Sequence, residues 1–579
     1  MEQTIMDYSI KIGGEAGQGI QTIGDTLARV FSRTGYHVFS HQDYESRIRG
    51  GHNFYQVRLS NAPVSAPRDE VDILVALDRE SIVLHESELG ENGRIIGDLA
   101  TLKLKPEKKQ FIDIPFGELA SKSGGSPIMA NTVAIGAVLG MLGLELTKLF
   151  DIITATFEKK GEAVIQANKD AALAGYDFAR KQCTACPFSV TPGEKAKLLI
   201  GGVESIALGA LASGCKFYAA YPMTPSTGIM NYLASKEKEY GIVVEQAEDE
   251  IAAINMALGA SFAGVRAMTG TSGGGFALMV EGVSLAAMTE TPIVIALGQR
   301  PGPATGLPTR TEQGDLFMVL AAGHGEFPRV VFAPGSPRQA VALTNKAFDL
   351  AEKYQIPSFI LFDTYLSDSQ WTLDGLDLST LTSADHRLRG EAFKGLSEYQ
   401  RHVFTETGVS PLGVPGEAEH LVVTDSDEHD EAGHIIEDGS TRNAMVEKRL
   451  FKKLPLIQSE ISAPFLYGEP DPAIVIVGWG SMYGLMREAV DRLAGSYSIA
   501  MLHFSELFPF PLRDQFDYIA YLEKAEHTIC IEQNATGQFA RLMKVETGYE
   551  FGAQISKFDG RPFTVERLTG ELHEHLRNV

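Results

Sequence analysis

Short apolar segments that read as buried strands alternate with helical patterns along most of this 579-residue chain. Between residues 197 and 370 the strand candidates are KFYAAYP, IVVEQ, VRAMTG, TPIVIALG, RVVFAPG and PSFILFD. This alternation is typical of a doubly wound α/β fold with a largely parallel sheet. The chain is also too long for one hydrophobic core, so the sequence predicts several domains.

Breaks in this alternation predict the domain boundaries. Residues 1–190 open with the strand-like YSIKIGG, a glycine-rich turn and an amphipathic helix, and CPFSVTPGEK then has the turn residues of a linker. Residues 371–470 are polar, rich in acids and interrupted by glycines and prolines, so we expect a connecting arm there. Residues 471–579 repeat strand then helix three times, in AIVIVGWG, IAMLHFSELFPF and TICIEQN.

Charge and hydropathy argue against several classes of partner. The formal net charge of −23 argues against nucleic acid or an anionic membrane as the main partner. The first residues contain an early acid and no apolar core, so they do not form a secretory signal. The longest apolar stretch, which begins at Ala130, is shorter than the ~20 residues of a membrane span and predicts a buried helix. We therefore expect a cytoplasmic protein.

Four cysteines in so long a chain do not form a disulfide framework. Cys183 and Cys186 form one CxxC, and the sequence has no second pair that would complete a four-ligand metal site. Half of a shared metal site or a redox pair stays an alternative. The favoured interpretation is a pair of reduced thiols at a domain edge.

A glycine-rich loop, GGEAGQGI, follows the first predicted strand. Its spacing differs from the GxGxxG of a dinucleotide fold. Backbone N–H groups in such a loop can bind an anion at a helix N-terminus, and Arg47 and Arg49 downstream could add charge for a phosphate. The same glycines also suit a tight strand-to-helix turn that binds nothing.

Two further segments carry candidate chemistry. In YPMTPST the two prolines stiffen a loop that presents Thr224 and Ser226, and Ser226 could instead simply cap the next helix. Glu250 precedes IAAINMALGA, a helix of small residues that another backbone or a flat ligand could approach closely. Arg310, in GPATGLPTRTEQGDL, could bind a carboxylate or could be an ordinary surface arginine.

Taken together, YPMTPST, VEQAEDEIAAINMALGASFAG, TGTSGGGF and GLPTRTEQGDL resemble the α subunit of the 2-oxoacid:ferredoxin oxidoreductases. GGEAGQG and RIRGG resemble the γ domain of that family, here fused ahead of α. The resemblance implies an N-terminal gamma-type α/β domain, a thiamine-diphosphate-binding (pyrimidine-type) doubly wound α/β domain and a transketolase C-terminal-like α/β domain. The connecting arm, residues 371–470, shows the weakest resemblance.

The resemblance also implies an activity. The family converts a 2-oxoacid and coenzyme A to an acyl-CoA and carbon dioxide on thiamine diphosphate, and passes two electrons through iron–sulfur clusters to ferredoxin. The γ–α fusion without a ferredoxin domain favours 2-oxoglutarate and succinyl-CoA, in either direction. Pyruvate and branched-chain 2-oxoacids are the alternative substrates.

Individual residues follow from the same resemblance. Glu250 is implied to be the catalytic carboxylate that contacts the aminopyrimidine of the cofactor, with Tyr221 and Pro222 of the YPxTP motif beside it. Thr224 and Arg310 are implied to bind the substrate.

Coenzyme A is implied to bind in the γ domain. Its residues would be Gly17, Gln18 and Gly19 of the glycine-rich loop, together with Arg47 and Arg49.

Half of the expected active site is missing from the sequence. Thiamine enzymes hold the diphosphate through Mg²⁺ on a GDG motif followed by an asparagine, and this chain contains no GDG. The resemblance therefore implies a separate β subunit that carries the diphosphate–Mg²⁺ pocket and a [4Fe–4S] cluster. We expect an (αβ)₂ heterotetramer, no metal on this chain, and no activity from this chain alone.

Two other functions fit the same motifs. A thiamine-dependent dehydrogenase or transketolase-type component would use lipoamide or a sugar as acceptor instead of ferredoxin. A regulatory scaffold would keep the folds without the chemistry, although the presence of Glu250, Thr224 and Arg310 together speaks against it.

Overall fold

The computed structural model describes residues 5–47, 50–103, 110–124 and 126–577. Contacts divide the chain into two compact units. The first contains residues 1–200, 369–376 and 563–579, and the second contains residues 201–368 and 377–562. The predicted arm and most of the last predicted domain therefore belong to the second unit, whereas the C-terminal helix α22 (Val565–Arg577) groups with the first.

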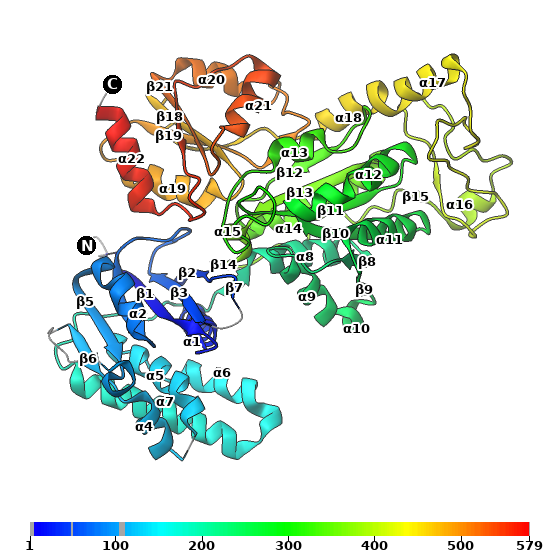
Figure 1. The fold of residues 1–579 in the computed structure, drawn as a ribbon. Helices are drawn as coiled ribbons and strands as arrows, with labels where there is room; N and C mark the ends of the chain where they lie inside the picture. The colour runs from blue at the N-terminus through cyan, green and yellow to red at the C-terminus, as the bar shows by residue number, and fades with distance from the viewer. Residues whose placement is uncertain (1–4, 48–49, 104–109, 125, 578–579) are drawn as a thin grey trace. The chain divides into compact units, whose positions relative to one another are not determined.

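A mixed eight-stranded sheet organises the first unit (Figure 1). Its order is β6-β5-β4-β1-β3-β2-β14-β7, in which β1, β4, β5 and β6 run parallel and β3 pairs antiparallel with β1 and β2. The strand predicted from YSIKIGG is confirmed as β1. The bounds are β1 Asp7–Ala16, β2 His37–Asp43, β3 Gly50–Ser60, β4 Val71–Ala76, β5 Leu89–Gly97, β6 Phe111–Asp113, β7 Leu198–Gly201 and β14 Ser369–Leu373.

Helices complete the core of the first unit. Helix α1 (Ile20–Arg33) buries its apolar face, and α5 (Ala130–Leu142), α6 (Thr147–Phe157) and α7 (Glu162–Gln182) contribute to the same core. Helix α5 is the apolar stretch predicted as a buried helix, which is confirmed. Within the described ranges, no helix combines the length and the hydropathy that crossing a membrane requires.

The structure joins Cys183 and Cys186, at the end of α7, in a disulfide, so the expectation of reduced thiols is wrong for this pair. The turn that follows α7 brings their Cα atoms to 5.0 Å, which is within the span of a disulfide. Cys215 and Cys530 are free and buried.

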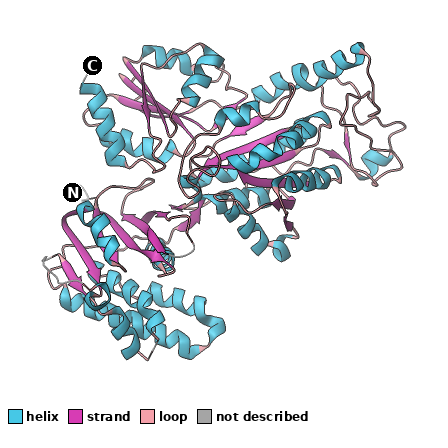
Figure 2. Ribbon diagram, in the orientation of Figure 1, coloured by secondary structure: helices cyan, strands magenta, loops and turns pink. Residues whose placement is uncertain are grey.

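The second unit holds a doubly wound sheet of order β20-β12-β13-β11-β10-β8-β9, as the fold class predicts. Helices α11 (Glu250–Phe262) and α12 (Gly273–Met288) cover one face, while α8 (Gly202–Ala212) and α14 (Pro337–Tyr354) cover the other (Figures 1 and 2). The strands are β8 Cys215–Ala220, β9 Val243–Gln246, β10 Arg266–Ser272, β11 Ile293–Gln299, β12 Val330–Phe332, β13 Pro357–Asp363 and β20 Glu506–Phe508.

A second sheet in this unit has the order β17-β19-β18-β21-β22. The predicted strand IAMLHFSELFPF is divided between the two sheets, because β19 joins this one and β20 pairs antiparallel with β12. Helices α19 (Met482–Leu493), α20 (Tyr518–Lys524) and α21 (Gln538–Thr547) accompany it. Its strands are β17 Phe465–Gly468, β18 Ile474–Trp479, β19 Ile499–Phe504, β21 His527–Glu532 and β22 Ala553–Ser556.

The arm is anchored to the doubly wound sheet by a buried cluster of charges. Glu290, just after α12, accepts hydrogen bonds from Lys448 and Lys453 of the arm, and all three side chains are almost fully buried. Arg401 of the arm donates to the Glu290 backbone carbonyl at 2.6 Å. The regular parts of the arm are β15 Arg387–Leu388, α16 Gly390–Lys394, β16 Leu412–Gly413, α17 Gly439–Val446, a π-helix Glu447–Lys452 and α18 Lys453–Ser459.

Candidate active site

Three strands of the doubly wound sheet deliver the candidate residues to one edge. Strands β8, β10 and β11 are neighbours, and β10 is parallel to both. Loops begin at Tyr221 after β8 and at Arg300 after β11, whereas β10 leads directly into α12 at Gly273. Ligands of open α/β sheets bind outside the carboxyl ends of the strands. This edge is therefore the candidate binding site of the second unit.

Glu250 is the first residue of α11 and is only 4% exposed. The neighbouring Asp249 caps the helix by accepting from the Ala252 amide at 2.7 Å, so Glu250 is not needed for capping. Its Oε1 atom is buried without a hydrogen-bond partner. A buried carboxylate oxygen without a partner is costly, so its presence points to a bound group that supplies the missing donor.

The glycines of TGTSGGGF make room beside this carboxylate. A Cβ atom on Gly275 would collide with Glu250 Oε1 and Thr271 Oγ1, so only glycine lets the first turn of α12 approach so closely. The small-residue surface predicted next to Glu250 is thus present on α12 as well as on α11.

The proline-stiffened loop lies against the other two strand ends. The Ser272 hydroxyl donates to Met223 Sδ, and Pro225 packs against Gly298, where a Cβ atom would lie 2.6 Å from Pro225 Cγ. Ser226 takes the N-cap position of α9 (Thr227–Ser235), but its hydroxyl donates to the Met223 carbonyl at 2.8 Å. The expectation that Ser226 caps the helix through its side chain is therefore wrong. Tyr221 remains 40% exposed at the start of the loop.

Two residues that the motif analysis did not single out complete this edge. Arg300, which follows β11, donates from Nη1 to the Thr224 carbonyl at 2.9 Å. Asp315 lies against the first turn of α12, where a Cβ atom on Gly273 would lie 2.6 Å from Asp315 Oδ2. The position of Arg300 directly after an apolar strand was the signal that could have found it.

Asp315 and Arg300 differ from ordinary surface charges. Asp315 Oδ2 is buried without a hydrogen-bond partner. Burial raises the pKa of Asp315 to about 6, although the nearby Arg300 opposes that shift. Burial also raises the pKa of Glu312 on the same loop, with a further contribution from Asp315. Perturbed acids in a cleft mark a functional site more often than a structural one.

Arg310 lies further along this loop and packs elsewhere. Its Cβ and Cγ atoms lie beside Gly560, and the Thr311 amide next to it donates to the Gly560 carbonyl at 3.2 Å. Gln313 anchors the loop by donating to the Trp479 carbonyl at 3.0 Å and accepting from the Gln533 amide at 3.0 Å. The carbonyl group of Thr224 thus contacts Arg300, whereas the backbone next to Arg310 is held by Gly560.

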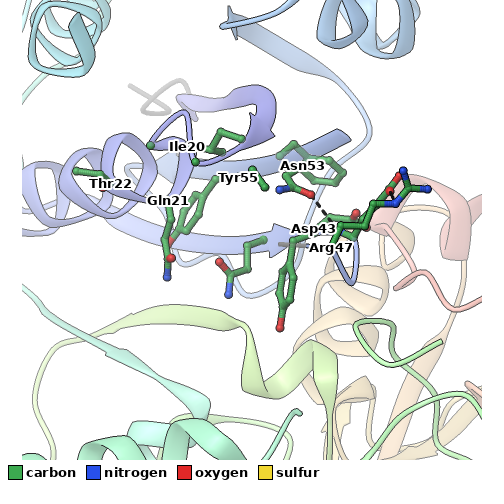
Figure 3. A pocket seen from close by; sticks show the side chains of 14 residues that line it. Ile20, Gln21, Thr22, Asp43, Arg47, Asn53 and Tyr55 are labelled. Atoms are coloured by element: carbon green, nitrogen blue, oxygen red, sulfur yellow. Dashed lines mark hydrogen bonds and ion pairs between the residues drawn. The ribbon is translucent and has the colours of Figure 1, made fainter. Parts of the chain in front are cut away.

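A separate cavity of about 550 Å³ lies in the first unit, between the start of α1 and the ends of β2 and β3 (Figure 3). Gly17 and Gly19 line it, both with positive φ angles of 93° and 83° that favour glycine. Figure 3 shows Gln21 and Tyr55 on one side, with Asp43, Asn53 and Arg47 on the other. The remaining lining residues are Ala16, Ile20, Thr22, Gln42, Tyr44, Glu45 and Phe54.

The five residues predicted to bind coenzyme A in the first unit do not all line this cavity. Gly17, Gly19 and Arg47 line the cavity, and Arg47 is paired with Glu45 at 2.9 Å. Gln18 does not line it and instead accepts from the Glu15 amide at 2.8 Å, which closes the turn. Arg49 lies outside the described residues. Among the described residues, no group of three or more His, Cys, Asp or Glu side chains is arranged to hold a metal ion.

Two family descriptions match this chain. Residues 9–178 match the family described as pyruvate ferredoxin/flavodoxin oxidoreductase. Residues 208–448 match the family described as pyruvate flavodoxin/ferredoxin oxidoreductase, thiamine diphosphate-binding. The second match includes every candidate residue of the sheet edge described above.

Individual relatives extend the similarity over the whole chain. A 2-oxoacid:ferredoxin oxidoreductase subunit alpha from Sulfolobus sp. is 33% identical over 99% of this chain and 97% of its own length. The 2-oxoglutarate oxidoreductase subunit KorA of Mycobacterium tuberculosis is 28% identical over 88% of this chain and 83% of its own. The solved 2-oxoglutarate:ferredoxin oxidoreductase from Magnetococcus marinus, with 2-oxoglutarate, coenzyme A and succinyl-CoA bound, superposes with a TM-score of 0.89. It is 31% identical and covers 98% of this chain and 99% of its own.

Proposed function

This chain belongs to the 2-oxoacid:ferredoxin oxidoreductase family as an alpha subunit, and from that premise we propose that its substrate is 2-oxoglutarate. The reaction would convert 2-oxoglutarate, coenzyme A and oxidised ferredoxin to succinyl-CoA, carbon dioxide and reduced ferredoxin, or run in reverse. Support for this substrate comes from the similarity to two proteins named for 2-oxoglutarate. Pyruvate and branched-chain 2-oxoacids are the competing substrates.

The buried, unpartnered oxygen of Glu250 is the observation that carries the proposal. Such an oxygen fits the aminopyrimidine half of thiamine diphosphate, whose ring nitrogen can share a proton with a carboxyl group, and the glycines of α12 leave space beside it. When bound, this cofactor supplies the carbanion chemistry that breaks the carboxyl bond of a 2-oxoacid. Glu250 would hold a proton at Oε1 and so set the tautomer of the ring, with Tyr221 and Pro222 bordering it.

Thr224 and Arg300 are the residues that we propose for the carboxylate of the substrate. Arg300 is fixed through one nitrogen by the Thr224 carbonyl, so its position is set before a ligand arrives. A guanidinium matches a carboxylate geometrically better than an ammonium does. Arg310 stays a second candidate. Its loop is held in place by Gly560, which Arg310 packs against and whose carbonyl accepts from the Thr311 amide.

Coenzyme A is proposed to bind at the cavity of the first unit. The cavity has the size of a small-molecule site, and its glycine turn at the start of α1 presents backbone N–H groups. Its lining contains two acids, Asp43 and Glu45, against the single cation Arg47. The amide and apolar parts of the ligand therefore suit the interior, while Arg47 would meet the phosphates. Arg49 stays a proposed phosphate contact on the basis of the sequence motif alone.

A partner β subunit is proposed to complete the active site with Mg²⁺, the diphosphate pocket and a [4Fe–4S] cluster that passes electrons to ferredoxin. Support comes from apolar side chains left exposed beside Glu250. Ile251, Met256 and Phe262 on α11 and Leu278 on α12 are between 37% and 50% exposed. Contiguous apolar side chains on the surface mark interaction sites. We propose an (αβ)₂ heterotetramer.

Reconstitution tests this function directly. The purified chain should show no viologen reduction with any 2-oxoacid, and activity should appear when the β subunit, thiamine diphosphate, Mg²⁺ and coenzyme A are added. Steady-state kinetics with 2-oxoglutarate, pyruvate and 2-oxoisovalerate should give the highest kcat/KM for 2-oxoglutarate. A preference for either other substrate would contradict the substrate assignment. Activity with lipoamide as the preferred acceptor would contradict the reaction class.

The Glu250→Gln variant tests the role proposed for the buried, unpartnered oxygen of Glu250. It keeps the shape of the side chain and removes its ability to hold a proton, so kcat should fall by at least about 100-fold. The melting temperature should stay within a few degrees. A near-normal kcat would show that Glu250 has another role.

A further inference from the structure

Asp315 is not used by the function proposed above, although it lies at the same sheet edge. The residue precedes α13 (Leu316–Ala321), but its side chain makes no capping hydrogen bond to that helix. Its amide donates to Gln299 Oε1 at 3.0 Å, which fixes the backbone and leaves the carboxyl group directed at Gly273. The carboxyl therefore serves no visible structural purpose.

Asp315 and Arg300 are close enough to affect each other electrostatically, yet they do not form an ion pair. Arg300 donates from Nη1 to the Thr224 carbonyl, and its other N–H groups have no hydrogen-bond partner among the residues that the structure describes. Arg300 therefore keeps donors for a ligand, and within its electrostatic reach lies a carboxyl group with one buried oxygen that has no hydrogen-bond partner. A ligand that accepts hydrogen bonds would satisfy the guanidinium, and it would also satisfy Asp315 if that carboxyl group is protonated.

The protonation state of Asp315 decides whether it can bind the carboxylate of a ligand. An ionised Asp315 would repel the carboxylate of a 2-oxoacid bound to Arg300, whereas a protonated Asp315 would donate one hydrogen bond to it. Burial raises the pKa of Asp315 to about 6, so protonation costs little near neutral pH. The charged groups that face it are Arg300 from the loop after β11 and Glu312 from its own loop, while the adjoining turn of α12 is uncharged.

We propose that Asp315 binds the 2-oxoacid in its protonated form, donating a hydrogen bond from its carboxyl group to a substrate whose carboxylate is held by Arg300. Binding then takes up one proton from solvent per site when the free residue is ionised. This inference rests on the proposed function, because it takes the ligand to be a 2-oxoacid.

Proton-linked binding gives a measurable signature. Above the pKa of free Asp315 the dissociation constant should rise as pH rises, approaching tenfold per pH unit, because each binding event must first protonate the carboxylate. The complex with the β subunit should be titrated with 2-oxoglutarate between pH 6 and 8 by calorimetry, in two buffers of different ionisation enthalpy. A C2-oxo analogue of thiamine diphosphate, which cannot react, should replace the cofactor. The wild-type complex should take up close to one proton per site at pH 8.

Three variants separate this role from its alternatives. Asp315→Asn keeps a hydrogen-bond donor without titrating, so it should bind with a nearly pH-independent affinity close to that of the wild type at pH 6. Asp315→Ala should bind at least about tenfold more weakly at pH 6. Glu312→Gln, on the same loop, should keep the pH slope and the proton uptake.

Each other result has a defined meaning. Absence of proton uptake in the wild type, or its persistence in Asp315→Asn, would overturn the inference, as would loss of uptake only in Glu312→Gln. If 2-oxoglutarate does not bind but pyruvate or 2-oxoisovalerate binds with an uptake that Asp315→Asn abolishes, the substrate assignment fails and the inference holds. If no 2-oxoacid binds to the wild-type complex, both are overturned.

Discussion

Glu290 is the residue on which the packing of the arm depends. Its carboxylate is shared by Lys448 and Lys453, and His402 Nδ1 lies 3.1 Å from the same group. Burial by itself would raise the pKa of Glu290, but the two ammonium groups outweigh burial and hold that pKa well below its usual value. Burial lowers the pKa of Lys448 to about 7 despite Glu290, because one carboxylate serves two lysines and Arg401 is close.

Removing Glu290 and removing Lys448 should therefore differ in cost. Glu290→Gln leaves two buried ammonium groups without a counter-charge, and we expect a loss of about 3–5 kcal/mol in the free energy of unfolding. Lys448→Met keeps the volume and leaves Glu290 paired with Lys453, so we expect a much smaller loss. Denaturant titration of the purified chain measures both. Equal losses for the two variants would contradict this account of the charge balance.

Only some residues of the candidate site could be predicted from the sequence. Glu250 was identifiable because a carboxylate heads a helix of small residues, and the structure adds that one oxygen is buried and unpartnered. Arg300 follows an apolar strand and could have been singled out on that ground, but no local pattern shows that it lies against Thr224 or that Asp315 lies against Gly273. Their roles depend on strand adjacency, which local patterns do not encode.

Among the elements, the paired helices α11 and α12 combine two surfaces of opposite kind. Their inner residues form part of a large core, whereas Ile251, Met256, Phe262 and Leu278 face outward. Because Glu250 begins α11, a partner that reaches the cofactor must approach close to this outer surface. Under the proposed function, these helices would connect the docking of the β subunit with catalysis.

Leu278→Asp tests this docking surface. A charge there would have to be desolvated on assembly, so the affinity for the β subunit should fall at least about tenfold, while the melting temperature of the free chain stays nearly constant. Val545→Asp is the matched control, since Val545 is 77% exposed on α21. Co-purification and sedimentation of each variant with the β subunit measure the effect. Equal losses of affinity in both variants would contradict a specific surface.

Strands with a continuous apolar run could be predicted from the sequence. Strands whose limits depend on pairing with another strand were harder to predict. The six strands expected between residues 197 and 370 are confirmed as β8–β13. Strand β5 was missed because its first half, Leu89–Asn92, is polar and partly exposed. The division of one predicted strand into β19 and β20 depends on the sheet edge at β12, which lies far away in the sequence.

At the scale of the whole molecule, the two compact units carry the two proposed ligand sites. The described residues that line the cavity belong to the first unit, and Glu250, Arg300 and Asp315 belong to the second. Fusion in one chain fixes their stoichiometry at one to one. The two half-reactions should consequently respond to different substitutions.

Arg47→Ala tests this division. Loss of a rim guanidinium should raise the KM for coenzyme A by about 5- to 20-fold, since a charge-assisted hydrogen bond to phosphate contributes roughly 1–2 kcal/mol at such a site. The KM for the 2-oxoacid, and the rate of 2-oxoacid decarboxylation without coenzyme A, should stay unchanged, because neither step uses the first unit. Arg33→Ala, at the exposed end of α1, is the matched control for loss of a positive charge and should leave both KM values unaltered. A parallel rise in both KM values for Arg47→Ala would mean that the cavity also shapes the 2-oxoacid site, and an unchanged KM for coenzyme A would remove the cavity as its binding place.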